Sequence, residues 1–93
     1  MNCVHLLGKI STTPVLSEDA KTFVVKFDIE VLEKYKKSNG ELKESEVIVP
    51  CMAWDSGAKL IHKFFKKNNK IIVHGKISTD ESFCVRIKSF EFV

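Results

Sequence analysis

The sequence predicts an all-β domain: a five-stranded barrel with one α-helix between the third and fourth strands. Apolar residues recur at every second position in five separate runs, which is the period of a β-strand. Between the third and fourth runs they recur instead at i, i+1, i+4 and i+5, which is typical of an amphipathic helix. At 93 residues the chain has room for a single core, so we expect residues 1–93 to form one domain.

The first two predicted strands cover residues 2–10 and 23–32. In both, alternate residues are apolar, and the opposite face of the second strand is largely charged, as expected where only one face meets a core. The segment 11–22 between them contains Pro14, and we expect it to be a loop.

A polar segment, 33–44, follows the second strand and contains Ser38-Asn39-Gly40, a hairpin-turn signal, so a hairpin loop is predicted there. The third strand, 46–54, is apolar on both faces, which indicates that both are covered. Pro50 lacks an N–H donor, so the strand must be bulged or at an edge at this position.

The predicted helix follows directly. Asp55 or Ser56 is expected to cap it, and it is expected to run to about Lys67. The fourth strand, the tight turn after it and the fifth strand are predicted at 71–77, 79–82 and 83–93. This order of elements is the plan of the OB-fold, a partly open barrel that binds oligonucleotides on one face. A ferredoxin-like sandwich is the alternative, but it needs a helix within 11–22, which is too short and contains Pro14.

Positive charge is concentrated in one quarter of the chain. The net charge is only +3, yet residues 56–78 hold six lysines and no acidic residue. Such a distribution favours a polyanionic partner, although a solvated helix face would have the same composition.

Several classes of protein are not expected. No run of eighteen apolar residues is present and the N-terminus does not resemble a signal peptide, so we expect no membrane segment and a cytoplasmic location, with an organelle not excluded. Cys3, Cys51 and Cys84 lack disulfide or zinc spacing and are interpreted as small buried hydrophobes. Asp28 and Glu30 imply no apolar pocket, and no nucleotide or hydrolase motif occurs. We therefore expect no enzyme activity, no cofactor and no metal.

Five segments in order resemble the bacterial-type single-stranded DNA-binding proteins (SSB): MNCVHLLGKI, VVKFDIEV, CMAWDSGAKLIHKFFKK, IIVHGKI and RIKSFEFV. The resemblance implies binding of single-stranded DNA and homo-oligomers, usually tetramers built from dimers. Three features depart from the family: no acidic tail follows Val93, the turn at 80–82 is short, and Ile48 stands where an aromatic residue is common. The tail is either absent from the protein or missing from this fragment. The short turn and the lost aromatic residue predict weaker binding or a smaller footprint.

The aromatic candidates for base stacking are Trp54, Tyr35 and Phe83. Trp54 ends the third strand and resembles a base-stacking position of the family; packing against the helix or a second subunit is the alternative. Tyr35 lies in the hairpin loop among lysines, and its alternative is an exposed surface tyrosine. Phe83 begins the fifth strand near a family base contact, although its parity with Val85 favours the core.

The candidate phosphate contacts share an outward position on the strands or a place beside Tyr35. They are Lys9, Lys26, Lys34, Lys36, Lys37, Lys70, Lys76, Arg86 and Lys88, and the helix lysines Lys59, Lys63 and Lys66 extend the set. The outward face of the first strand carries Cys3, His5 and Leu7, where the resemblance implies an oligomer interface; coverage by the loop 11–21 is the alternative. His62 and His74 are expected to be isolated and to face solvent.

The expected function is therefore non-catalytic binding of single-stranded DNA at the nucleoid, which protects exposed strands in replication, repair and recombination. Two alternatives remain open. One is a dimeric adaptor in replication restart, similar to primosomal replication protein B, with restart proteins as partners; the other is an RNA-binding OB module.

Overall fold

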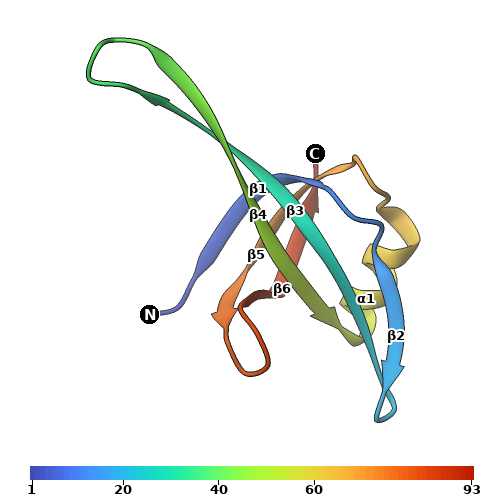
Figure 1. The fold of residues 1–93 in the computed structure, drawn as a ribbon. Helices are drawn as coiled ribbons and strands as arrows, with labels where there is room; N and C mark the ends of the chain where they lie inside the picture. The colour runs from blue at the N-terminus through green and yellow to red at the C-terminus, as the bar shows by residue number, and fades with distance from the viewer.

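The computed structural model describes residues 1–93, apart from the side chain of Asp19. Over these residues the chain forms six strands and one helix (Figure 1). The elements are β1 (Val4–Ile10), β2 (Val15–Asp19), β3 (Thr22–Lys36), β4 (Leu42–Trp54), α1 (Asp55–Phe64), β5 (Lys70–Ser78) and β6 (Cys84–Phe92). No helix within the described part of the chain is long and apolar enough to cross a membrane.

Five of the strands close into a barrel, as the sequence predicts. The sheet order is β1-β5-β6-β4-β3-β2, and an additional β1–β3 pairing closes the ring and leaves β2 at an edge. Only the pairing of β4 with β6 is parallel among the pairings of the described chain. The inward side chains form one apolar core, which includes Ile10, Val25, Phe27, Ile29, Cys51, Ala53, Ile61, Ile71, Val73 and Val85.

The position predicted for the helix is wrong by one strand, because the segment expected to be a loop contains β2. This short strand pairs with the beginning of β3, from Val15 opposite Lys26 onward. Leu16 packs against the core, and Pro14 is buried just before the strand and does not interrupt it. The connecting residues Ala20 and Lys21 both have positive φ, 48° and 69°, which suits a two-residue hairpin turn. The helix therefore lies between the fourth and fifth strands.

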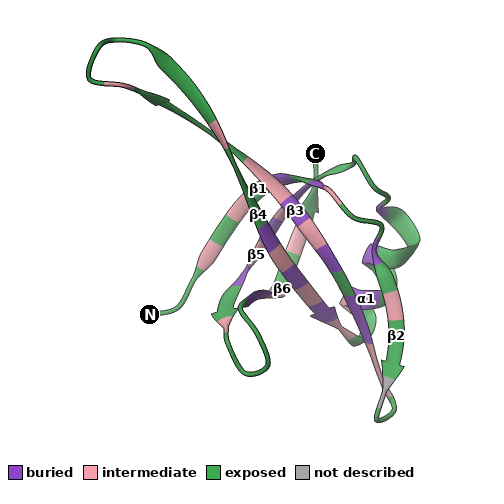
Figure 2. Ribbon diagram, viewed as in Figure 1, coloured by how far each residue is buried: buried purple, intermediate pink, exposed green. Residues whose placement is uncertain are grey.

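The predicted hairpin loop 33–44 is also mostly strand. β3 and β4 stay paired from Val24 opposite Trp54 to Lys36 opposite Leu42, and together they extend beyond the barrel (Figure 1). The turn is confined to residues 37–41, where the Lys37 N–H donates to the Glu41 carbonyl oxygen at 2.7 Å. Figure 2 shows that this projecting hairpin, hereafter the arm, is almost wholly exposed, whereas the buried residues lie along the barrel strands.

Helix α1 covers one end of the barrel and buries Ala58 and Ile61. Its predicted cap is wrong: Trp54 is the N-cap residue, no side chain caps the helix, and Asp55 lies in the first turn. There a carboxylate still interacts favourably with the positive end of the helix dipole. The helix ends at Phe64, before Lys67, because the backbone is already extended at Phe65.

The cysteines are divided between the core and the surface. Cys51 and Cys84 are buried as expected, but Cys3 precedes β1 and is exposed, so its predicted burial is wrong. Burial raises the pKa of the Cys51 thiol to about 12, because the thiolate would be poorly solvated.

Candidate nucleic-acid interface

A row of outward-facing residues crosses four strands of the barrel. Lys26 on β3 is opposite Met52 on β4, Met52 is opposite Arg86 on β6, and Arg86 is opposite Lys76 on β5. Residues directly opposite in a sheet project from the same face. Lys26 and Lys76 are exposed, so the row presents three cations around one thioether.

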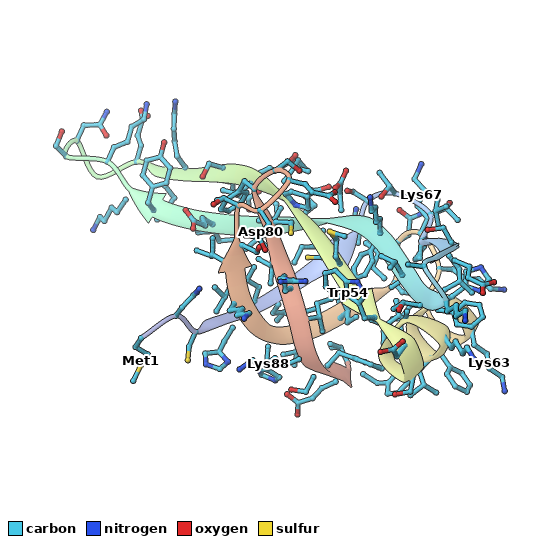
Figure 3. The ribbon with its side chains drawn as sticks, turned by 90° about the horizontal axis from the view of Figure 1, so that it is seen from below. Met1, Trp54, Lys63, Lys67, Asp80 and Lys88 are labelled. Carbon is cyan, nitrogen blue, oxygen red and sulfur yellow. The ribbon has the colours of Figure 1, made fainter. Side chains whose placement is uncertain are left out.

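Trp54 lies beside this row, two residues beyond Met52 on β4, and it is half-buried. The Arg86 guanidinium lies over the indole, 4.4 Å from the ring centroid. An Arg86 nitrogen also lies 3.5 Å from a carboxylate oxygen of Asp80. Figure 3 shows Trp54 toward the end of β4, with Asp80 on the loop after β5. The indole is therefore part of an exposed site and does not lie in the core.

A cavity of about 170 Å³ opens beside the indole. Trp54, Met52 and Arg86 line it, together with Cys84 and the β5–β6 loop. The Cys84 Sγ lies 3.6 Å from the Met52 Sδ, which makes a polarizable apolar surface next to the ring. The cavity thus offers an aromatic face, an apolar surface and a cation, which are the groups that bind a stacked nucleobase.

The acidic side of this cavity, which Asp80 and Glu81 line, does not follow from the sequence. From the sequence, both residues are expected only in the turn between the last two strands, without a role. The sequence offers one signal for them. The loop connects two strands that carry outward-facing cations, so it borders the face on which these cations lie.

The arm carries a second group of predicted contacts. Tyr35 is half-exposed and lies opposite Lys43, which the sequence analysis also missed. The neighbouring Lys43 side chain lowers the pKa of the Lys37 ammonium from its usual value, because two positive charges at short range repel. Two cations this close make a favourable place for a phosphate. Lys34 instead pairs with Glu44 at 3.6 Å, and Lys36 is exposed opposite Leu42.

Lys9 and Lys70 form a third group of predicted contacts. They are opposite each other on β1 and β5, and they line a cavity of about 400 Å³ with Leu7, Leu32 and Glu30. Lys70 lies at the start of β5, six residues from Lys76. The predicted phosphate contacts on the barrel strands and the arm therefore form three separate groups. The remaining candidates lie apart from them: Lys59 and Lys63 are on α1, and Lys66 follows it.

Phe83 and Lys88 flank Arg86 along the chain. Phe83 precedes β6 and is 50% exposed, so the core position favoured by its parity is wrong. Lys88 is exposed on β6, two residues after Arg86, at the β-bulge opposite His74 and Gly75.

The predicted isolation of His74 is wrong. The Nδ1 atoms of His5 and His74 share a hydrogen bond of 2.8 Å, and His74 Nε2 lies 2.6 Å from a Glu91 carboxylate oxygen. Leu7, two residues after His5, is 55% exposed, so the loop 11–21 leaves this strand face open. Within the described residues, no group of three or more His, Cys, Asp or Glu side chains is placed to hold a metal ion.

Comparisons with solved structures agree with this fold. The chain matches the Plasmodium falciparum SSB in complex with ssDNA, with a TM-score of 0.88 at 18% identity over 100% of this chain and 95% of that chain. The priB protein from Ralstonia solanacearum has a TM-score of 0.82 at 11% identity, over 100% of this chain and 99% of that one. At such identities the similarity shows the fold alone.

Sequence comparison goes further. Single-stranded DNA-binding protein 1 of Chlorobaculum tepidum is 29% identical over 80 residues, which is 85% of this chain and 49% of that protein. The chain spans about half the length of the curated relatives that it matches. A family model described as the Single-strand binding protein family matches residues 1–84. Because that match covers most of the barrel, the chain belongs to the single-strand binding protein family.

Proposed function

We propose that this chain binds single-stranded DNA without catalysis, by phosphate neutralisation and base stacking. The observation that carries the proposal is the outer face on which Trp54 and Arg86 stack beside the row from Lys26 to Lys76. A flexible polyanion with flat bases is bound by cations for the phosphates and aromatic faces for the bases. Similarity to the single-stranded DNA-binding protein of Chlorobaculum tepidum supports the same ligand.

The strand follows the sheet in this proposal. Phosphates lie near Lys26, Lys76 and Lys88, while a base enters the cavity beside Trp54. The arm adds a further phosphate contact at Lys37 and Lys43, with Tyr35 as a second stacking surface. Such binding covers exposed strands in replication, repair and recombination, at the nucleoid in the cytoplasm.

A titration with oligo-dT at two salt concentrations tests the proposal. Trp54 is the only tryptophan in the chain, so stacking on it should quench the intrinsic fluorescence. Affinity should fall steeply with salt, because each neutralised phosphate releases counterions. No change in fluorescence together with no retardation of the oligomer would overturn the proposal. Competition with an RNA oligomer of the same sequence decides between DNA and RNA.

We also propose that copies of the chain associate through the outer face of β1. The exposed side chains of Cys3, His5 and Leu7 support this, since an exposed apolar strand face favours association. Light scattering on the wild type and on Leu7→Glu tests the surface, because a buried glutamate would dissociate the oligomer. A dimer rather than a tetramer would favour the adaptor function in replication restart.

A further inference from the structure

The cavity beside Trp54 has an acidic wall that phosphate binding does not explain. Asp80 and Glu81 come from the loop between β5 and β6 and line the same cavity as the indole. A carboxylate repels a phosphate at short range, so this wall weakens any contact of the cavity with the DNA backbone. A part of the nucleotide that carries hydrogen-bond donors fits this wall better than a phosphate does.

Base edges supply such donors, but the bases differ. Cytosine presents an N4 amino group and adenine an N6 amino group, and both donate to carboxylate oxygens. Thymine presents the O4 acceptor where cytosine has its amino group. A carboxylate near that position attracts cytosine and repels the thymine carbonyl oxygen.

The stacking surface and the acidic residues border the same cavity. The Trp54 indole and the Arg86 guanidinium lie one over the other, 4.4 Å apart, and Met52 and Cys84 form the apolar surface next to them. A base that stacks here has its face against these groups. A polar edge of that base can then reach the two acids, which line the cavity together with Ser78 at the end of β5 and Ser82 in the loop.

Only one of the two acids is free to contact the base. Asp80 is engaged with Arg86 at 3.5 Å. Glu81 is exposed and forms no ion pair or side-chain hydrogen bond with the residues that the structure describes. It can turn toward the cavity without losing an interaction in the free protein.

We propose that Glu81 makes this cavity selective for bases with an exocyclic amino group, so that cytosine is bound in preference to thymine. The inference rests on the proposed function, because it concerns which base occupies the stacking site. Asp80 is a positioning residue here, since it holds Arg86 over the indole.

The test compares oligo-dC and oligo-dT of equal length at one salt concentration and slightly alkaline pH. We measure the dissociation constants for the wild type, for Glu81→Gln and for Glu18→Gln, a matched control on β2 outside the cavity. The wild type should bind oligo-dC about fivefold more tightly, near the lower end of the range for one base contact. Glu81→Gln should reduce the ratio of the two constants toward one, and Glu18→Gln should leave it unchanged.

The ratio of the dissociation constants for oligo-dC and oligo-dT distinguishes base selection by Glu81 from simple repulsion of phosphates. If Glu81 only repels phosphates, its neutralisation tightens both oligomers by the same factor and the ratio does not change, which would overturn the inference. Equal binding of both oligomers by the wild type would also overturn it, yet leave the proposed function intact. Failure to bind either oligomer would overturn both.

Discussion

The Arg86 guanidinium lies 4.4 Å from the centre of the Trp54 ring, so one face of the indole is covered before any ligand arrives. An exposed cation–π contact contributes about 0.5–1 kcal/mol, and the exposed ion pair of Arg86 with Asp80 contributes about 0–1 kcal/mol. Stacking of a base on an aromatic face contributes about 1–3 kcal/mol. The two Arg86 contacts together contribute about 0.5–2 kcal/mol, so a base displaces Arg86 at a net gain only where its stacking lies in the upper part of its range. A base can also stack on the guanidinium plane while the contact persists.

Replacement of Trp54 tests the stacking site directly. Trp54→Ala should weaken binding of oligo-dT by about 1–3 kcal/mol, because the stacking surface is lost. Trp54→Phe should retain much of the affinity, since it keeps an aromatic face. The measurement is electrophoretic retardation or anisotropy of a labelled oligomer, with circular dichroism to show that the barrel is folded. Wild-type affinity in folded Trp54→Ala would mean that the bases stack elsewhere.

The cations of the row from Lys26 to Lys76 should contribute to the salt dependence of the DNA affinity. For single strands, the slope of log K against log salt is about −0.7 for each neutralised phosphate. Lys26→Ala, which removes one end of the row, should reduce the magnitude of the slope by about 0.7. Lys21→Ala is the matched control, because Lys21 is exposed in the turn between β2 and β3, outside the row. Equal slopes for the wild type and Lys26→Ala would remove Lys26 from the phosphate path.

The barrel could be predicted because its signals are local. In β3 the apolar residues from Phe23 to Val31 alternate with charged or smaller ones, so the strand and its inward face are evident from a few residues. The arm could not be recognised as strand, because polar and charged residues occupy both of its faces beyond Leu32. β2 was missed because the Ala20-Lys21 turn adopts positive φ without glycine or asparagine.

The candidate site could be predicted only in part, because its geometry is non-local. The outward parity of Lys26 and Arg86 follows from alternation within each strand. Their place in one row depends on the parallel pairing of β4 with β6, which joins Met52 to Arg86 and is not encoded in either segment alone. The contacts of Arg86 with Trp54 and Asp80 depend on the same pairing and were not foreseen.

Gly75 should be needed for the geometry of β5 and β6. A β-bulge lies between His74 and Gly75, and a Cβ at Gly75 would overlap the backbone carbonyl of Arg86. Gly75→Ala should therefore destabilise the protein by about 2–3 kcal/mol, as overpacking does in a fixed backbone. Gly57→Ala is the control, because nothing lies within 4 Å of its added Cβ and alanine favours the helix. Urea unfolding measures the stability of both variants. If Gly75→Ala unfolds at the same urea midpoint as the wild type, β5 and β6 accommodate the added Cβ without loss of stability.

Because of Cys51, the free energy of unfolding should depend on pH in the alkaline range. Burial raises its pKa to about 12 in the folded protein, from 9.0 for an ordinary thiol, because the core disfavours the thiolate. The folded state keeps this proton while the unfolded chain loses it, so the contribution of the neutral thiol is complete below pH 9.0 and is lost as the pH rises toward about 12. Each pH unit in this window costs at most about 1.4 kcal/mol from this group.

The experiment is a series of urea unfolding curves from neutral to strongly alkaline pH, for the wild type and for Cys51→Ala. The variant loses some stability at every pH through the smaller side chain, so the slope against pH is the quantity to compare. The wild type should lose free energy of unfolding more steeply than Cys51→Ala above pH 9.0 and in parallel with it below. Parallel curves throughout would show that the Cys51 thiolate is solvated in the folded state, which would require water to reach the centre of the barrel.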